Sequence, residues 1–194
     1  GLRGPAATGH ALGMPPQLPP ILDETELPAV ALRSAVLDGE LYPIGEGFRP
    51  VDLPLDAAAR AGSLRAIAVR RRVLAGRTAA WVWGAVADPG RPYRVLIPDT
   101  AAVGHAAPHA EEGVLAREAR LRLDDVTLLD GVPVTSPLRN AVDLLCGPQE
   151  PWHRAAVDLL LAEAAADVPA LLADLRSRRR LTGRREAIAR LRCW

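Results

Sequence analysis

The chain of 194 residues is 49% hydrophobic but only 4% aromatic, so it can form one large domain or two small ones around a core of leucine, valine and alanine. All 24 of its basic residues are arginines, and 23 acidic residues leave a formal net charge of +1, which gives no overall sign of a polyanionic partner. No apolar run approaches the roughly 20 residues that a membrane-spanning helix needs, and no secretory signal opens the sequence, so we expect a cytoplasmic protein without a membrane partner.

Residues 1–20 are rich in glycine, proline and alanine, and we expect them to be flexible. The next stretch predicts a helix that stops at Asp38-Gly39, followed at once by a hairpin with strands over 41–44 and 48–51. A helix joined directly to a small hairpin is the outline of a winged helix, a module that reads DNA with its second helix. An ordinary helix and hairpin packed on the rest of the protein is the alternative.

Charge is distributed unevenly along the chain. Residues 21–56 hold eight acidic side chains and only two basic ones, Arg33 and Arg49, which works against attraction to phosphates. Residues 170–194 show the reverse, with eight arginines and two acidic residues, and a smaller basic run covers 70–72. Two interpretations of the C-terminal arginines stay open: a solvated helix end whose dipole attracts cations, or a patch for phosphates or an acidic partner.

The remaining elements alternate between helical and extended patterns. Asp56 is placed to cap a helix with an apolar face over 57–68, and a short helix follows Thr78. Strands are predicted over 93–97, 114–123, 126–129 and 132–134, and Ser136-Pro137 opens the first of four helices, the others covering about 150–166, 167–179 and 182–192. The sequence therefore predicts an α+β protein. An N-terminal winged helix-turn-helix at 21–54 precedes a larger α+β domain at 55–194, which has a small sheet and a helical C-terminal third.

No constellation of catalytic or metal-binding residues stands out. His105 and His109 precede two glutamates, but Gly104 and Pro108 disfavour the helix that would place both imidazoles on one face, so we expect a loop here and no metal site. Asp124-Asp125 and Asp130 are interpreted as turn residues. Because phosphate-binding loops and nucleophile elbows are also absent, we expect neither enzymatic activity nor a cofactor.

Several segments resemble, in the same order, those of actinobacterial AbiEi-type antitoxins of type IV toxin–antitoxin systems. They are residues 18–25, 32–50, 78–84, 131–145 and 181–191. The resemblance spans about residues 18–192 and implies a winged helix that represses its own operon and a C-terminal domain that counters a nucleotidyltransferase toxin. The family's helix and wing are usually basic, whereas this chain has Asp38, Glu40 and Glu46 there, which shifts the attraction for DNA toward the C-terminal arginines. Some relatives continue into a restriction-endonuclease-like domain; its motifs are missing here, so we expect no nuclease activity.

The first functional hypothesis is a transcriptional regulator that binds its own promoter as a homodimer on paired half-sites. Its candidate DNA contacts are Arg33, Ser34, Arg49, Arg176, Arg178, Arg179, Arg180, Arg184 and Arg185. The alternative is a protein-interaction module with a degenerate winged helix that no longer binds DNA, whose C-terminal arginines hold a partner.

Overall fold

The computed structural model describes residues 19–99, 109–111, 113–178 and 181–192. Helix α1 (Ala29–Leu37) is followed by β1 (Leu41–Ile44) and β2 (Gly47–Pro50), which pair as an antiparallel hairpin at the positions that the sequence predicts. Leu32 of α1 is fully buried against Leu22 and Leu41. Within the described ranges α1 is the one helix that precedes the hairpin, so the winged helix as a complete module stays a prediction.

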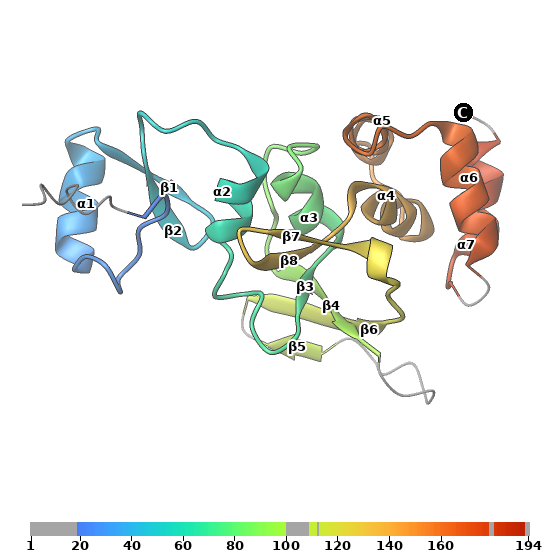
Figure 1. Ribbon diagram of the computed structural model, residues 1–194, viewed down its shortest axis with the longest axis horizontal. Helices are drawn as coiled ribbons and strands as arrows, with labels where there is room; N and C mark the ends of the chain where they lie inside the picture. Colours follow the sequence, from blue (N-terminus) through green and yellow to red (C-terminus); the bar gives the residue numbers. More distant parts are fainter. Residues whose placement is uncertain (1–18, 100–108, 112, 179–180, 193–194) are drawn as a thin grey trace, which may run out of the picture.

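A mixed six-stranded sheet forms the centre of the molecule (Figure 1). Its strands are β3 (Val73–Leu74), β4 (Tyr93–Pro98), β5 (His109–Glu111), β6 (Val114–Ala119), β7 (Val126–Leu129) and β8 (Val132–Thr135), in the spatial order β5-β6-β4-β3-β8-β7. The pairs β4–β6 and β3–β8 are parallel, and the other three are antiparallel. The turn at Asp130-Gly131 joins β7 to β8 as the sequence predicts, with both residues at positive φ.

Two short helices cover one face of this sheet. They are α2 (Ala57–Gly62) and α3 (Gly76–Val82), and their buried Ala61, Ala79 and Val82 pack in one cluster with the inward side chains of β3, β4, β6 and β8. Asp56 caps α2 as predicted, accepting a 2.7 Å hydrogen bond from the backbone N–H of Ala59.

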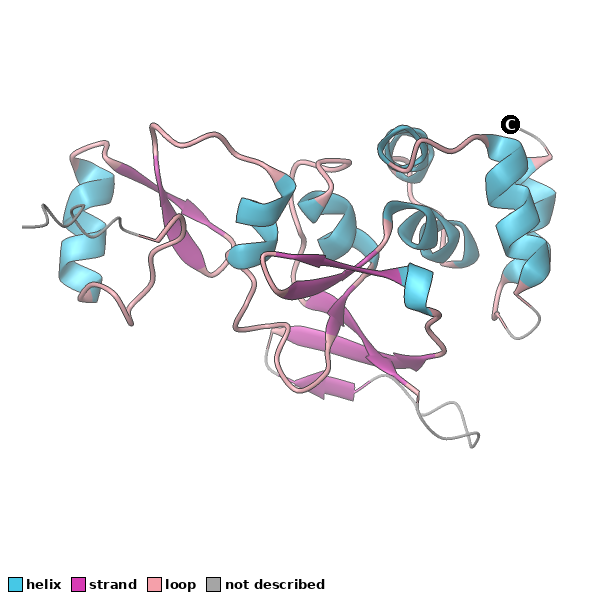
Figure 2. Ribbon diagram, in the orientation of Figure 1, coloured by secondary structure: helices cyan, strands magenta, loops and turns pink. Residues whose placement is uncertain are grey.

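Four further helices pack beside the sheet, beyond α3 (Figure 2). They are α4 (Pro137–Cys146), α5 (His153–Glu163), α6 (Val168–Ser177) and α7 (Arg184–Leu191). Their core is almost entirely leucine, valine and alanine, in agreement with the composition. The indole N–H of Trp83, at the end of α3, donates a 2.8 Å hydrogen bond to the carbonyl of Thr135 and thereby links α3 to the start of α4.

The sequence-based prediction of elements was wrong at several places. Helix α2 ends at Gly62, well short of residue 68, because the carbonyl of Ser63 accepts a hydrogen bond from the backbone of Glu46 at the hairpin turn. Strand β6 stops at Ala119, and a 3₁₀ turn over Leu123–Asp125 replaces its predicted end. Strands β3 and β5 were not predicted; His109 lies on β5 rather than in a loop, while His105 lies outside the described residues.

Candidate nucleic-acid interface

Helix α1 presents its outer face to solvent at one end of the molecule (Figure 1). Arg33 and Ser34 are both exposed on that face. The Ser34 hydroxyl donates a long hydrogen bond of 3.4 Å to the carboxylate of Asp38, one turn later. The guanidinium of Arg33 makes no ion pair with any described residue, so it remains available to a partner. Of the three N-terminal candidates, Arg33 and Ser34 therefore have the exposure that contact with DNA requires.

Arg49 on β2 has a structural role instead. Its side chain is only 4% exposed, and it donates hydrogen bonds to the carbonyls of Pro20 at 3.0 Å and of Pro54. These bonds hold the segments before α1 and after β2 against the hairpin. Because the guanidinium is enclosed by its own chain, Arg49 is not available to a phosphate or a base as the sequence-based assignment required.

Glu46, at the hairpin turn, is held by the sheet. Its carboxylate accepts hydrogen bonds of 2.6 Å from the Tyr93 hydroxyl and 2.5 Å from Arg91. Gly45 beside it adopts φ +55°, and a Cβ there would overlap the side chain of Ser63. The tip of the hairpin therefore packs on the sheet and does not project as a free wing, and the negative charge of Glu46 is balanced by Arg91.

Arg178 is the centre of a buried ion-pair network. It donates two hydrogen bonds to Asp125, of 2.5 and 2.9 Å, and one of 2.7 Å to Asp174. Arg139 reaches the same Asp125 carboxylate at 2.8 Å, and both Asp125 and Arg139 are at most 2% exposed. Burial alone would raise the pKa of Asp125, but the hydrogen bonds from Arg178 and from the backbone of Arg122, together with the charge of Arg139, hold it below its ordinary value. Arg178 thus fastens α6 to the β6–β7 turn and to α4.

Two more C-terminal arginines satisfy the carbonyl ends of helices. Arg184 donates to the carbonyls of Arg176 and Arg178 at the end of α6. Arg190 donates to the carbonyls of Leu145 and Gly147 at the end of α4. The last carbonyls of a helix have no partner within it, and cations are stabilised there. For Arg184 and Arg190, these contacts support the interpretation that the C-terminal arginines stabilise helix ends.

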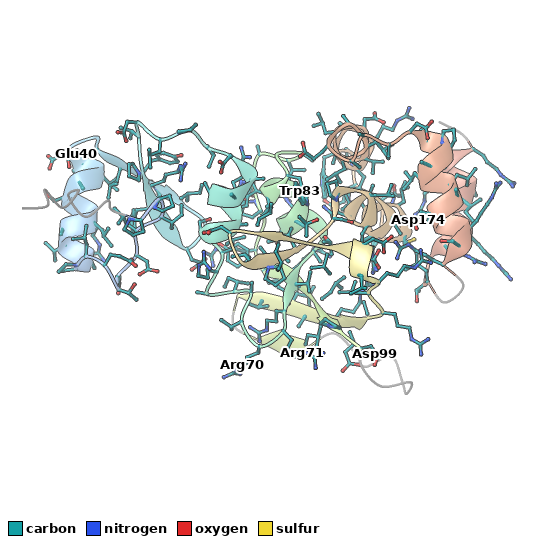
Figure 3. All side chains as sticks on the ribbon, viewed as in Figure 1. Glu40, Arg70, Arg71, Trp83, Asp99 and Asp174 are labelled. Atoms are coloured by element: carbon teal, nitrogen blue, oxygen red, sulfur yellow. The ribbon has the colours of Figure 1, made fainter. Side chains whose placement is uncertain are left out.

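Among the C-terminal arginines that the structure describes, Arg176, Arg185 and Arg192 are exposed. Arg179 and Arg180 lie outside the described residues. Helices α6 and α7 lie at the opposite end of the long axis from α1, so the two groups of candidate contacts do not form one patch (Figure 1). Figure 3 places Arg70 and Arg71 elsewhere, at the lower edge of the sheet region and away from both ends of the long axis.

A family model of the AbiEi antitoxin C-terminal domain matches residues 72–192, which is more than half of the chain. The matched span includes the whole six-stranded sheet and helices α3 to α7. The chain belongs to the AbiEi antitoxin family. No curated protein matches the sequence.

The family match assigns an antitoxin domain to the AbiEi chain, and this family is not a family of enzymes. Helix α1, the hairpin and α2 precede the matched span, so the match does not bear on the predicted DNA-reading part. No helix in the described part of the chain is long and apolar enough to cross a membrane. The same residues contain no group of three or more histidine, cysteine, aspartate or glutamate side chains that could hold a metal ion.

Proposed function

We propose that this chain is the antitoxin of a type IV toxin–antitoxin system, which represses its own operon by binding DNA and counters a nucleotidyltransferase toxin. The observation that carries the proposal is the antitoxin-domain match over residues 72–192. Helix α1 supports the DNA-binding part, because it offers Arg33 and Ser34 on an exposed face at the end of the molecule. In this proposal α1 enters the major groove, and a homodimer places two such helices on paired half-sites.

The exposed arginines of α6 and α7 have a second role in this proposal. Because Arg176 and Arg185 lie at the end opposite α1, they cannot flank α1 on the same half-site. They contact either DNA farther along the promoter or an acidic surface of the toxin. Both functions would be sensitive to salt, since exposed charges are screened by ions.

A gel-shift titration with a fragment of the chain's own promoter region, repeated over a salt series, tests the DNA part. Arg33→Ala should weaken binding and lower the salt dependence by about one counterion. Arg65→Ala is the matched control, because Arg65 is also exposed but pairs with Asp130. Absence of binding to that fragment at low salt would contradict the DNA-binding part. Co-expression with a neighbouring nucleotidyltransferase tests the antitoxin part: relief of growth arrest supports it, and unrelieved arrest contradicts it.

A protein-interaction module without DNA binding is the second candidate function, and one observation favours it. The outer face of α1 that carries Arg33 and Ser34 also carries Val30 and Leu37, which are 78% and 88% exposed. Residues at i, i+3, i+4 and i+7 lie on one side of a helix, so two exposed apolar side chains flank Arg33 and Ser34 on this face. The hairpin tip is held on the sheet through Glu46, and Arg49 is buried, so neither side chain is free to contact DNA. A pull-down in which Val30→Ser and Leu37→Ser release a protein partner, with no DNA shift, would favour this candidate.

A further inference from the structure

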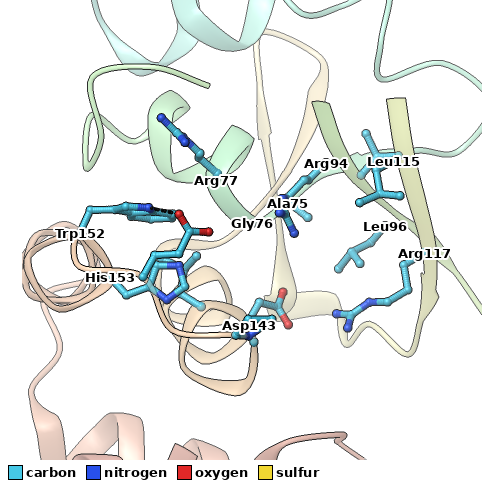
Figure 4. Close-up of a pocket in the computed structure, with 15 residues that line it drawn as sticks. Ala75, Gly76, Arg77, Arg94, Leu96, Leu115, Arg117, Asp143, Trp152 and His153 are labelled. Carbon is cyan, nitrogen blue, oxygen red and sulfur yellow. Dashed lines mark hydrogen bonds between the residues drawn. The ribbon is translucent and has the colours of Figure 1, made fainter. Parts of the chain in front are cut away.

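A cavity of about 280 Å³ lies where the sheet meets the connection between α4 and α5 (Figure 4). Its lining includes Leu96 and Leu115 from strands β4 and β6, and Leu144 and Trp152 from the helical side. None of its lining residues belongs to the candidate nucleic-acid interface. The volume is near the lower end of small-molecule pockets, which start at about 300 Å³, so it suits a small ligand rather than a protein segment or duplex DNA.

Two arginines on neighbouring strands point from the sheet toward this cavity. In the parallel pair of β4 and β6, Leu96 lies opposite Arg117, and Arg94 shares the face of Leu96 because side chains alternate along a strand. Neither Arg94 nor Arg117 forms an ion pair or a side-chain hydrogen bond with any described residue. Arg77, in contrast, is engaged by Asp88 and lies over the ring of Trp152. Two guanidinium groups on apolar walls, without an ion pair or hydrogen bond to a described residue, are typical of a site for a phosphate, whose oxygens match the planar fork.

The opposite side of the cavity offers hydrogen-bond acceptors. The Asp143 side chain is 7% exposed; its Oδ2 accepts from Arg139 at 3.1 Å, whereas its Oδ1 has no hydrogen-bond partner. Figure 4 shows Arg117 reaching toward the Asp143 carboxylate, but no ion pair joins them. Nδ1 of His153 is likewise buried without a partner. Buried polar atoms without partners are uncommon, and a ligand group that donates a hydrogen bond would satisfy Asp143.

Trp152 completes the wall on the helical side. Its indole N–H donates a 2.8 Å hydrogen bond to Glu150, and its ring meets that of His153 edge-on at 4.1 Å. These contacts fix the orientation of the indole. The cavity therefore combines a cationic side, an acceptor side and a fixed aromatic wall.

We propose that this cavity binds a small organic phosphate, such as a sugar phosphate or a mononucleotide. The phosphate lies between Arg94 and Arg117, and a hydroxyl or amino group of the organic part donates to Asp143. This function goes beyond DNA binding and toxin neutralisation, because none of its residues lies on α1, α6 or α7.

Calorimetric titration of the full chain tests the proposal with ribose 5-phosphate, AMP, GMP, CMP and UMP as probes. Adenosine and inorganic phosphate are the ligand controls. We expect saturable binding of at least one organic phosphate, with adenosine and inorganic phosphate each binding at least about tenfold more weakly, since each lacks one of the two recognised ends. Arg94→Ala and Arg117→Ala should each weaken binding by about tenfold or more. Arg154→Ala, which changes an exposed arginine on α5 outside the cavity, should leave it unchanged.

Three results would overturn the proposal. The first is no binding of any organic phosphate at millimolar concentration to the folded chain. The second is full affinity in the Arg94→Ala/Arg117→Ala double variant, whose folding is checked by circular dichroism. The third is equal affinity for inorganic phosphate and for the tightest organic phosphate, which would remove the role given to Asp143. Because both arginines are exposed, their removal should leave the fold intact.

Discussion

The hydroxyl of Tyr93 on β4 donates a 2.6 Å hydrogen bond to the carboxylate of Glu46 at the tip of the β1–β2 hairpin. Tyr93 is 2% exposed, and Arg91 adds an ion pair to the same carboxylate. Burial of the phenol, together with the hydrogen bond to Glu46 and its negative charge, raises the pKa of Tyr93. This contact joins the predicted DNA-reading part of the chain to the antitoxin domain.

Removing the Tyr93 hydroxyl should loosen this junction. We expect Tyr93→Phe to lower the free energy of unfolding by about 1 to 2 kcal/mol, because a hydrogen bond to a charged acceptor is lost. The raised pKa of Tyr93 has a further consequence above pH 10.0, its ordinary value. There the unfolded chain ionises first, so stability should fall as pH rises, and it should fall less in the variant. Urea unfolding at neutral and alkaline pH measures both effects, and an unchanged unfolding midpoint in Tyr93→Phe would contradict this assignment.

The pairing of Asp125 with Arg178 and Arg139 predicts a much larger loss. Arg178→Ala leaves a buried carboxylate with fewer partners, and we expect about 3 to 5 kcal/mol of destabilisation. Arg176→Ala, an exposed arginine two residues earlier on α6, should change stability by at most about 0.5 kcal/mol. Denaturant unfolding of the two variants in parallel separates the roles, and equal losses would refute the buried network.

The same network should keep its contribution to stability until the pH falls below the ordinary pKa of an aspartate. The folded pKa of Asp125 lies below its ordinary value of 3.8, so the stabilisation from its charge is present above pH 3.8. It is lost as pH falls through the lowered pKa, because the unfolded chain takes up the proton first. Asp125→Asn should therefore be less stable than the parent at pH 7, with a difference that shrinks below pH 3.8. If the stability difference between parent and variant stayed constant down to the acid transition, the charge of Asp125 would not be the source of the acid sensitivity.

The sequence predicts local structure well where short-range chemistry decides it. Asp56 before an apolar helix and Asp130-Gly131 between two strands act through neighbouring backbone groups, and both predictions are confirmed. The two-residue strand β3 has no period to detect, and its place depends on pairing with β4 and β8. The division at residue 54 into a winged-helix module and a second domain stays a prediction.

Exposure of charged side chains could not be predicted in the same way. Arg49 and Arg178 are residues of the type that binds phosphate, so the sequence alone suggests DNA contacts. Each is nevertheless buried against a partner distant in the sequence, Pro20 for Arg49 and Asp125 for Arg178. The cavity shows the same limit. Arg94 and Arg117 stand among mostly apolar residues on two strands that are far apart in the sequence, and only the sheet register brings the two arginines to one face.

The burial of His153 leads us to expect that the chain loses stability in mild acid. Burial lowers the pKa of His153 below its ordinary value of 6.5, with the charges of Arg94 and Arg190 acting in the same direction and that of Glu150 opposing them. The neutral ring is thus favoured in the folded chain, and stability should fall as pH drops below 6.5, because the unfolded chain binds the proton first. His153→Phe keeps a ring against Trp152 and should flatten this dependence between pH 7 and pH 5. Thermal unfolding across that range measures this pH dependence. If the melting temperatures of the parent and the variant fell in parallel with pH, the loss of stability would belong to another group.

Changing Arg33 to alanine should affect DNA binding, whereas changing Arg49 to alanine should affect stability. Arg49→Ala removes buried hydrogen bonds to the carbonyls of Pro20 and Pro54, and we expect it to lower the free energy of unfolding by about 1 to 3 kcal/mol. Any loss of DNA binding in this variant would then follow from a loosened hairpin, and it should be partly recovered at lower temperature. Arg33→Ala removes an exposed side chain, so stability should change by at most about 0.5 kcal/mol while the affinity for the promoter fragment falls. Unfolding curves and gel shifts on the same preparations make the comparison. If Arg49→Ala kept full stability and lost DNA binding at every temperature, Arg49 would be a direct DNA contact and not a structural residue of the hairpin.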